Sequence, residues 1–187
     1  MQLIKKMPVD AEKYVAENFQ QQIRPPPECP NCGSHGSLWA LCYYFRNLSR
    51  LVLRGTLRVS VRRFRCRQCR RTLSILPSFA LPYRLIQSAT VDEYFRGSSD
   101  AGASTRWLPL LRSYWIRFLK WIPEIDRVLG RTLSHHPLYG DGARWHASIT
   151  AVYGNVEACT RQIVRLFRIT LLGRYRCHQP YRPRGDP

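Results

Sequence analysis

Acidic residues are scarce in this sequence, and one long stretch has none. The 187 residues include 12 Asp and Glu against 30 Lys and Arg, which gives a formal net charge of +18. Between Glu28 and Asp92 there is no acidic residue and no lysine. The arginines of this stretch are Arg46, Arg50, Arg54, Arg58, Arg62, Arg63, Arg65, Arg67, Arg70, Arg71 and Arg84. A charge balance of one sign favours a polyanionic partner, either a nucleic acid or an anionic membrane surface.

Long apolar runs are also missing. No uncharged apolar stretch approaches the about 18 residues that a membrane-spanning helix requires, and residues 1–8 lack the apolar core of a signal peptide. Hydrophobic residues nevertheless make up 44% of the chain, which is enough for a packed core rather than a disordered basic tail. We find no internal repeat. The sequence therefore predicts one medium domain or two small ones, in a cytoplasmic and nucleoid-associated protein.

Recognisable catalytic motifs are absent as well. The chain has no Gly-rich phosphate loop, no nucleophile elbow and no Cys–His pair at a catalytic spacing. We expect no strand ladder beyond residue 80, so the later acids are not placed at strand ends as two-metal chemistry would require. These acids are Asp92, Glu93, Asp100, Glu124, Asp126, Asp141, Glu157 and Asp186. The sequence therefore predicts a protein that is not an enzyme.

Two Cys-x-x-Cys pairs are the strongest signal that the sequence does contain. Cys29 with Cys32 and Cys66 with Cys69 each have the spacing that lets two thiolates reach one metal ion from a tight turn. Together they complete the closed tetrahedron of one structural Zn²⁺, and Cys42 is expected to be a buried apolar residue rather than a fifth ligand. Disulfides or unrelated buried thiols are the alternatives. The seven cysteines are an odd count, and the two pairs are better explained by a metal than by disulfides, which favours a reducing compartment.

A β-hairpin is predicted between the two cysteine pairs. Residues 51–65 read as its two arms, because residues 57–61 alternate apolar and polar side chains. A slip of phase at residues 62–63 predicts a bulge that returns Phe64 to the covered face. Residues 38–45 are apolar and β-prone, and we expect them to form a further strand. Two metal-binding turns joined by a hairpin are typical of a zinc ribbon.

The residues that follow the two pairs differ from each other. Gly33 follows the first pair and Arg70 follows the second. This position often requires a positive φ, which an arginine tolerates poorly. Arg70 is therefore a departure from the expected pattern.

Arginines of the ribbon are the predicted nucleic-acid contacts, because the planar guanidinium suits phosphates and guanine edges. Duplex DNA is the polymer that we expect, and a merely solvated basic hairpin is the alternative. A second set lies on a late helix, which could be the reading helix of a helix-turn-helix or a helix that closes the core. The full set of candidates is Arg54, Arg58, Arg62, Arg63, Arg65, Arg67, Arg70, Arg71, Arg161, Arg165 and Arg168.

The predicted fold class is α+β, with a zinc ribbon followed by a helical region. The predicted divisions are residues 1–24 with a helix over 9–23, the ribbon over 25–80, and a helical domain with a basic tail over 81–187. Helices are expected over residues 85–95, 109–122, 123–133, 142–153 and 155–169. The apolar arc of residues 107–122 indicates core, with a membrane-surface or partner helix as the alternative. His135, Asp141 and His146 are a weaker candidate for a second metal site.

The segments Cys29 to Gly33, Arg62 to Thr72 and Leu73 to Tyr83 together resemble the zinc-ribbon proteins of bacterial insertion elements. These are similar to the N-terminal part of transposases and include stand-alone members of uncharacterised function. The overlap is strongest over residues 29–96. The resemblance implies that the four cysteines are ligands and that the neighbouring arginines help to recognise element ends.

These lines of evidence predict a zinc-dependent, non-catalytic DNA-binding protein associated with a mobile element. Two rival functions remain open. One is a truncated or diverged transposase, whose catalytic part is encoded elsewhere or lies within residues 90–187. The other is an interaction subunit that uses Trp107, Trp115 and Trp121 to dock on a transposase or recombinase.

Overall fold

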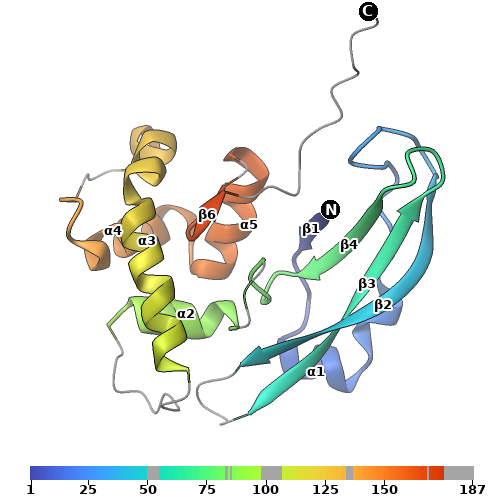
Figure 1. Cartoon of the computed structure of the whole chain (residues 1–187), viewed down its shortest axis with the longest axis horizontal. Coiled ribbons are helices and arrows are strands. Elements are labelled where there is room, and N and C mark those ends of the chain that lie inside the picture. Colours follow the sequence, from blue (N-terminus) through green and yellow to red (C-terminus); the bar gives the residue numbers. More distant parts are fainter. Residues whose placement is uncertain are drawn as a thin grey trace, which may run out of the picture. The chain divides into compact units, whose positions relative to one another are not determined.

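The computed structural model describes residues 1–49, 55–82, 84, 86–97, 107–133, 137–167 and 169–174. Its fold is α+β, with one four-stranded sheet and a helical part (Figure 1). The chain divides into two compact units. The sheet unit comprises Met1–Arg46 and Arg58–Pro77, and the helical unit comprises Asn47–Leu57 and Ser78–Tyr175. Among the described helices, none is long and apolar enough to span a membrane.

The sheet has the strand order β1-β4-β3-β2. Strand β1 (Gln2–Lys5) runs parallel to β4 (Thr72–Pro77), and β3 (Thr56–Cys66) runs antiparallel to β4. Strand β2 (Leu38–Ser49) lies beyond β3 at the edge. The first cysteine pair therefore lies before β2, and the second begins at the last residue of β3.

The predicted hairpin forms, but with a different first arm. The sequence placed both arms within residues 51–65, whereas β2 is the strand beside β3 and extends the predicted strand 38–45 as far as Ser49. Residues 50–54 between the arms lie outside the described part. The difference arises because burial alternates weakly along β2: six of its twelve side chains are exposed and only Leu38, Leu48 and Ser49 are buried. Strands β1 and β4 were not predicted either.

Burial along β3 follows the predicted pattern. Val59 and Val61 are fully buried while Arg58 is exposed, and Phe64 is buried again three positions after Val61. The predicted slip of phase is thus confirmed in the burial pattern, but the register from Arg62 to Arg65 against β4 is continuous, so the predicted bulge is not present in that pairing. Apolar side chains of β3 and β4 build a small core under one face of the sheet.

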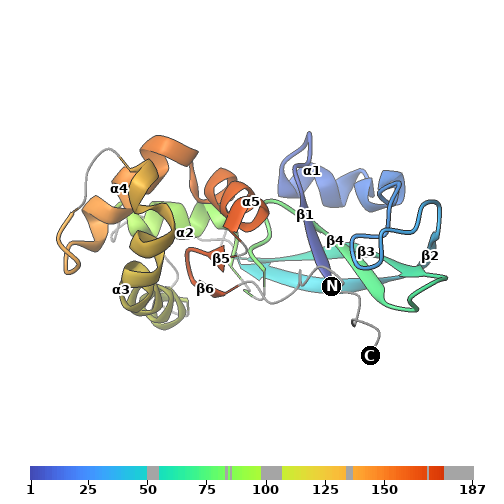
Figure 2. The same ribbon diagram turned by 90° about the horizontal axis from the view of Figure 1, so that it is seen from above.

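A short helix covers this face (Figure 2). Helix α1 (Ala11–Ala16) is followed by a 3₁₀ turn, η1 (Phe19–Gln22), so the predicted helix over 9–23 is broken in two. The carboxylate of Asp10 caps α1 by accepting a hydrogen bond from the Lys13 N–H at 2.8 Å. Tyr14 is fully buried, and its hydroxyl donates to the Ser60 carbonyl of β3 at 2.9 Å. This hydrogen bond fixes α1 to the sheet.

The helical unit packs its helices around an apolar cluster drawn from residues 81–172. Its main elements are α2 (Ser88–Phe95), α3 (Leu108–Leu129), η2 (Gly130–Thr132), α4 (Gly142–Tyr153) and α5 (Val156–Phe167). A two-stranded ladder of β5 (Ile169–Thr170) and β6 (Gly173–Arg174) follows. The expectation of no strand ladder beyond residue 80 is therefore wrong, although this one is only two residues long on each side.

Helix α3 is continuous, which corrects the prediction of two helices that meet at Pro123. Its buried positions keep the three- and four-residue spacing of one helical face through the proline. They are Leu111, Tyr114, Phe118, Ile122, Ile125 and Leu129. Pro123 removes one backbone hydrogen bond from the helix. Burial of the apolar face outweighs this loss, so the helix continues through the proline.

The α4–α5 pair forms as predicted. Asp141 accepts a hydrogen bond from the Arg144 N–H at 3.0 Å at the start of α4, and Asn155 accepts one from the Ala158 N–H at 3.0 Å at the start of α5. Gly154 joins the two helices with a φ of +86°, a conformation that favours glycine. One detail of the predicted apolar face is wrong, because Leu166 is exposed.

Candidate metal centre and nucleic-acid interface

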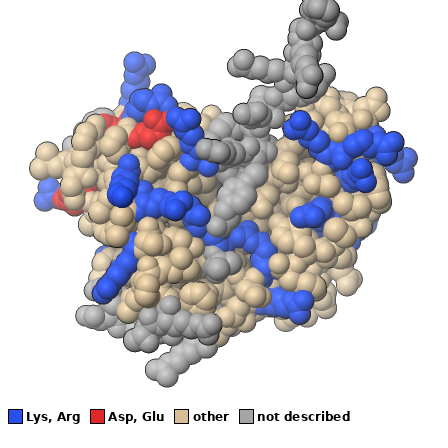
Figure 3. Space-filling model, viewed as in Figure 1, with Lys and Arg blue, Asp and Glu red and all other residues tan. Residues whose placement is uncertain are grey.

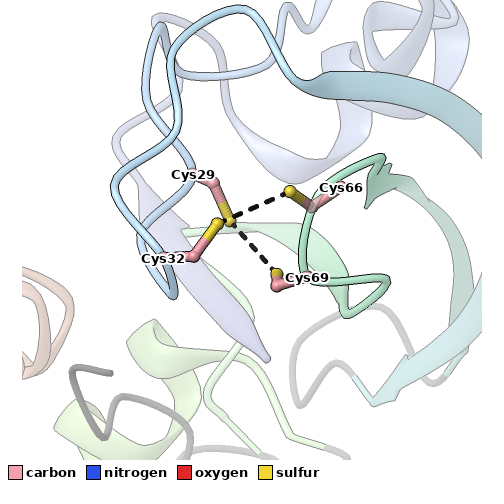
Figure 4. A group of neighbouring side chains, drawn as sticks. All are labelled: Cys29, Cys32, Cys66 and Cys69. Carbon is pink, nitrogen blue, oxygen red and sulfur yellow. Dashed lines mark hydrogen bonds between the residues drawn. The ribbon is translucent and has the colours of Figure 1, made fainter. Parts of the chain in front are cut away.

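Four cysteine sulfurs converge in the sheet unit (Figure 4). The sulfur atoms of Cys29, Cys32, Cys66 and Cys69 all lie within 4.8 Å of one another. The Cys29–Cys69 separation is 3.8 Å and the Cys32–Cys66 separation is 3.7 Å. Four ligands at about 2.3 Å from a tetrahedral ion stand roughly 3.8 Å apart, whereas a disulfide would bring two sulfurs to about 2.0 Å. The cluster can therefore hold a metal ion, and these cysteines are free thiols rather than disulfides.

Similar turns hold the two cysteine pairs. The Cys29 N–H donates to the Ser34 carbonyl at 2.9 Å, and in the same way the Cys66 N–H donates to the Arg71 carbonyl at 3.0 Å. Both residues after the pairs have positive φ, +72° at Gly33 and +58° at Arg70. The second turn therefore needs the conformation that an arginine adopts only with strain, on the order of 1–3 kcal/mol. The Arg65 guanidinium donates to the Arg70 carbonyl at 3.2 Å and supports this turn.

Two serines complete the surroundings of the sulfurs. The hydroxyl of Ser34 lies 3.1 Å from the Cys32 sulfur, and the hydroxyl of Ser37 lies 3.2 Å from the Cys66 sulfur. The two hydroxyls are 2.6 Å apart. Sequence analysis missed both serines, although their place within five residues of the first pair is a signal that could have found them.

The thiols differ in how easily they ionise. Burial opposes ionisation of Cys66, but hydrogen bonds from Ser37 and from the backbone of the second turn outweigh it and lower its pKa to about 5. The hydrogen bond from Ser34 lowers the pKa of Cys32. Burial raises the pKa of Cys29 to about 12. The Cys66 thiolate is thus favoured before a metal arrives, and the ion's own charge would deprotonate the others.

Cys42 does not belong to this cluster. It lies exposed on β2, so the prediction that it is a buried apolar residue is wrong. The reason is that β2 is an edge strand whose central side chains are largely exposed, so an apolar run does not imply burial there.

The histidine candidate for a second metal site is not assembled among the described residues, and His135 lies outside them. Asp141 caps α4 and forms an ion pair with Arg144 at 3.2 Å. The Nε2 atom of His146 lies 3.1 Å from Asp92 Oδ1, and both side chains are buried. Sequence analysis named both residues but not their pairing, which joins α4 to α2.

A third group completes this buried pair. Arg96 contacts the other carboxylate oxygen of Asp92 at 2.6 Å. Burial alone would raise the pKa of Asp92, but the hydrogen bond from His146 and the Arg96 charge outweigh it and lower the pKa. The Val156 N–H, at the start of α5, also donates to Asp92 at 3.4 Å. Asp92 thus ties together three helices of the helical unit.

Arginines of β3 lie over aromatic rings of β2. The Arg58 guanidinium carbon is 3.8 Å from the centroid of the Phe45 ring, and that of Arg62 is 4.4 Å from the Tyr43 ring. Such cation–π contacts contribute about 0.5–1 kcal/mol each at exposed sites. A third pair, Arg63 over Tyr44 at 4.7 Å, involves half-buried side chains. The rings hold these arginines in place without neutralising their charge.

The outer face of β2 exposes aromatic side chains. Trp39, Tyr43 and Phe45 are separated by even numbers of residues, so their side chains lie on the same face of the strand. They are 40%, 39% and 57% exposed. Arg58, which lies over Phe45, points away from the buried Val59 and hence away from the face that α1 covers. Figure 3 views the face away from α1, and over the strands it shows Lys and Arg side chains but no Asp or Glu.

The remaining predicted arginines are distributed as follows. Arg67, Arg70 and Arg71 are exposed around the second metal-binding turn, and Arg65 is half-buried beside them. Arg161 is half-buried and Arg165 is exposed on α5. Arg54 and Arg168 lie outside the described residues.

The tryptophans proposed as a docking surface contribute to the helical unit. Trp115 is half-buried and its ring centroid lies 5.0 Å from that of Phe95. Trp121 packs on the same apolar cluster, and its indole N–H donates to the Thr170 carbonyl at 3.1 Å. Trp107, just before α3, is half-buried. These contacts agree with the interpretation that the apolar arc of residues 107–122 belongs to the core.

Comparison with known proteins adds one finding. A family model described as a domain of unknown function (DUF6431) matches residues 29–109. The matched stretch contains the four clustered cysteines, strands β2 to β4 and helix α2. Neither the curated proteins nor the solved structures give a match. The part of the chain that this family model describes is thus the part that carries the candidate site.

Proposed function

We propose that the four-cysteine cluster binds one structural Zn²⁺ and that the sheet unit is a zinc ribbon. Support comes from the sulfur separations of 3.7 and 3.8 Å, which suit a tetrahedral ion, and from a purely thiolate ligand set. Four protein ligands leave no position for a substrate, so the ion stabilises the fold rather than catalyses a reaction. Elemental analysis of protein purified without chelator tests this, with one zinc per chain expected. A visible absorption band from ferric thiolate would instead assign iron to the same cluster.

We further propose that the sheet unit binds nucleic acid. The observation that carries this proposal is the set of arginines held over aromatic rings on a stretch that has no acidic residue. Guanidinium groups that have no carboxylate partner in their own stretch remain available for phosphates. The exposed arginines around the second metal-binding turn extend the same positive surface. Phosphate contacts of this kind are independent of sequence, so they position the protein rather than select a site.

The salt dependence of binding to duplex DNA tests this proposal. Each phosphate contact that is lost should reduce the slope of log affinity against log salt by roughly 0.9. Arg58→Ala with Arg62→Ala should therefore reduce the slope by about two units and weaken all sequences alike. The matched control is Arg161→Ala with Arg165→Ala on α5. If the control pair abolishes binding and the hairpin pair leaves it unchanged, α5 is the binding element and the sheet is scaffold.

The wider role that we propose is that of a cytoplasmic, nucleoid-associated DNA-binding protein that works beside a mobile element and performs no chemistry itself. Its support is the motif resemblance over residues 29–96 together with the basic sheet. A transposase or recombinase subunit is the protein partner that this role implies, and pull-down with DNA and with protein separates a binding module from a docking subunit. Strand cleavage that depends on a divalent metal would show that the chain is an enzyme instead.

A further inference from the structure

We infer that the outer face of β2 and β3 binds unpaired bases, so that the preferred ligand is a single-stranded segment rather than a continuous duplex. The inference rests on the proposed nucleic-acid function and specifies which polymer the same site prefers. It starts from Trp39, Tyr43 and Phe45, which are all at least 39% exposed although aromatic side chains are among the most favourable to bury.

The spacing of these rings suits a row of stacked bases. Tyr43 and Phe45 are two residues apart on one face of an extended strand, which separates them by about 6.6 Å, and Trp39 lies about 13 Å before Tyr43. Base–aromatic stacking is tolerant of sequence because every base has a π-face, and it requires that the base leave its duplex stack. A duplex would place only its phosphates against this face, so the exposed rings would contribute little to its binding.

Arginines are placed to hold the phosphates of such a strand. The Arg58 and Arg62 guanidinium groups lie over one face of the Phe45 and Tyr43 rings, at 3.8 and 4.4 Å. A base would therefore stack on the part of these rings that stays exposed, with a cation next to it. A positive groove combined with aromatic rings is the arrangement by which proteins bind single strands without sequence preference. The charge complementarity and the absence of any acid between Glu28 and Asp92 favour a polyanion over an apolar protein partner for this face.

Labelled oligo(dT) and a duplex of equal length, compared at the same salt concentration, test the inference. We expect wild-type protein to bind the unpaired oligonucleotide more tightly. Trp39→Leu and Phe45→Leu keep apolar side chains but remove the rings, and each should weaken oligo(dT) binding by about 5- to 150-fold while duplex binding stays unchanged. Retained duplex binding shows that these variants are folded. Tyr139→Leu, which removes an equally exposed ring from the helical unit, is the matched control and should change neither affinity.

A spectroscopic readout supplies an independent check. Oligo(dT) should quench the fluorescence of Trp39, and Trp39→Phe should keep the affinity while it removes most of that quenching, since Phe can still stack. Equal losses on both polymers, or a duplex that binds more tightly than oligo(dT), would overturn the inference and leave the proposed function standing. If wild-type protein binds neither polymer, the proposed function itself is wrong.

Discussion

The two units of this chain are stabilised in different ways. The helical unit has a continuous apolar cluster that includes fully buried Phe118, Ile122 and Trp145. The sheet unit has one short α-helix and a small core, and it adds four sulfurs that can bind one ion. Small units that cannot bury enough apolar surface commonly depend on a metal or on disulfides. A metal bound by these sulfurs would therefore stabilise the sheet unit in the way that the apolar cluster stabilises the helical unit.

Charge is also arranged differently in the two units. In the helical unit, basic side chains lie against carboxylates, as in Arg96 with Asp92 and the bidentate pair of Arg127 with Glu124. In the sheet unit, Arg58 and Arg62 lie against aromatic rings. The contrast is one of degree, because Lys13 pairs with Glu17 in the sheet unit and Arg84 lies over the Tyr114 ring in the helical unit. An ion pair satisfies both partners, whereas a ring positions a cation without cancelling its charge. This difference is why we propose that the sheet unit, rather than the helical unit, binds a polyanion.

The largest expected effect comes from removing one metal ligand. Cys66→Ser leaves three thiolates and should remove most of the metal-binding free energy, which is about 10–16 kcal/mol for structural zinc in small modules. We expect zinc to be lost and amide hydrogen-exchange protection to collapse in β3 and β4, while α3 stays protected. Cys42→Ser is the control, because Cys42 is exposed and outside the cluster. If α3 loses protection in parallel with β3, the two units share one folding transition and the boundary predicted after residue 80 is wrong.

A smaller effect should come from a substitution in the helical unit, which should destabilise that unit and leave the zinc content unchanged. His146→Ala removes one hydrogen bond from the buried Asp92 carboxylate, which keeps its contact with Arg96, and loss of a hydrogen bond to a charged group costs about 1.5–3 kcal/mol. Urea unfolding followed by helical circular dichroism should show this loss, while the zinc content remains at one per chain. His35→Ala is the control, since its 3.4 Å contact with Glu28 is exposed and should contribute less than about 1 kcal/mol. Loss of zinc in the His146 variant would contradict the separation of the two units.

Acid should destabilise the helical unit through the same pair. The folded-state pKa of Asp92 is lowered, so its contribution to stability is complete above the unfolded pKa of about 3.9 and is lost as the pH falls through the lower folded value. The free energy of unfolding of the helical unit should therefore fall with pH in that range. Asp92→Asn should remove this part of the pH dependence. An unchanged acid profile in the variant would show that other carboxylates determine it.

Local features were the ones that the sequence predicted well. The cysteine spacing predicted the sulfur cluster, and the helix from residue 155 was predicted with Asn155 as its cap. The helix over 142–153 was also predicted, although sequence analysis considered Asp141 as a metal ligand and not as the cap that it is. The shift in the alternation of buried and exposed residues before Phe64 could likewise be predicted from the sequence of β3 alone. Each of these depends on residues that are close together in the chain, where spacing alone restricts the geometry.

Features that depend on distant partners were missed. Strand β1 pairs with β4 across about seventy positions of sequence, as in the Gln2–Ser74 register, and no periodicity within either strand indicates that partner. The buried pair of Asp92 and His146 joins two helices in the same non-local way. Pro123 misled the prediction because local propensity favours a break there, whereas packing of the buried face holds α3 together.

The smallest effect concerns the second metal-binding turn. Arg70 has a φ of +58°, so Arg70→Gly should relieve strain and stabilise the sheet unit by about 1 kcal/mol, as the glycine at the first turn already does. Zinc retention against a competing chelator measures this gain. Arg71→Gly is the matched control: Arg71 is also exposed but has no positive φ, so the change should destabilise the unit by roughly 0.5–1 kcal/mol.

The same two variants also test DNA binding, because each lacks one arginine. Each should reduce the slope of log affinity against log salt on duplex DNA by roughly 0.9 if both arginines contact phosphates. A stabilised Arg70→Gly variant with weaker DNA binding would show that the strained arginine is kept for its charge, whereas unchanged DNA binding would leave its strain without a functional reason.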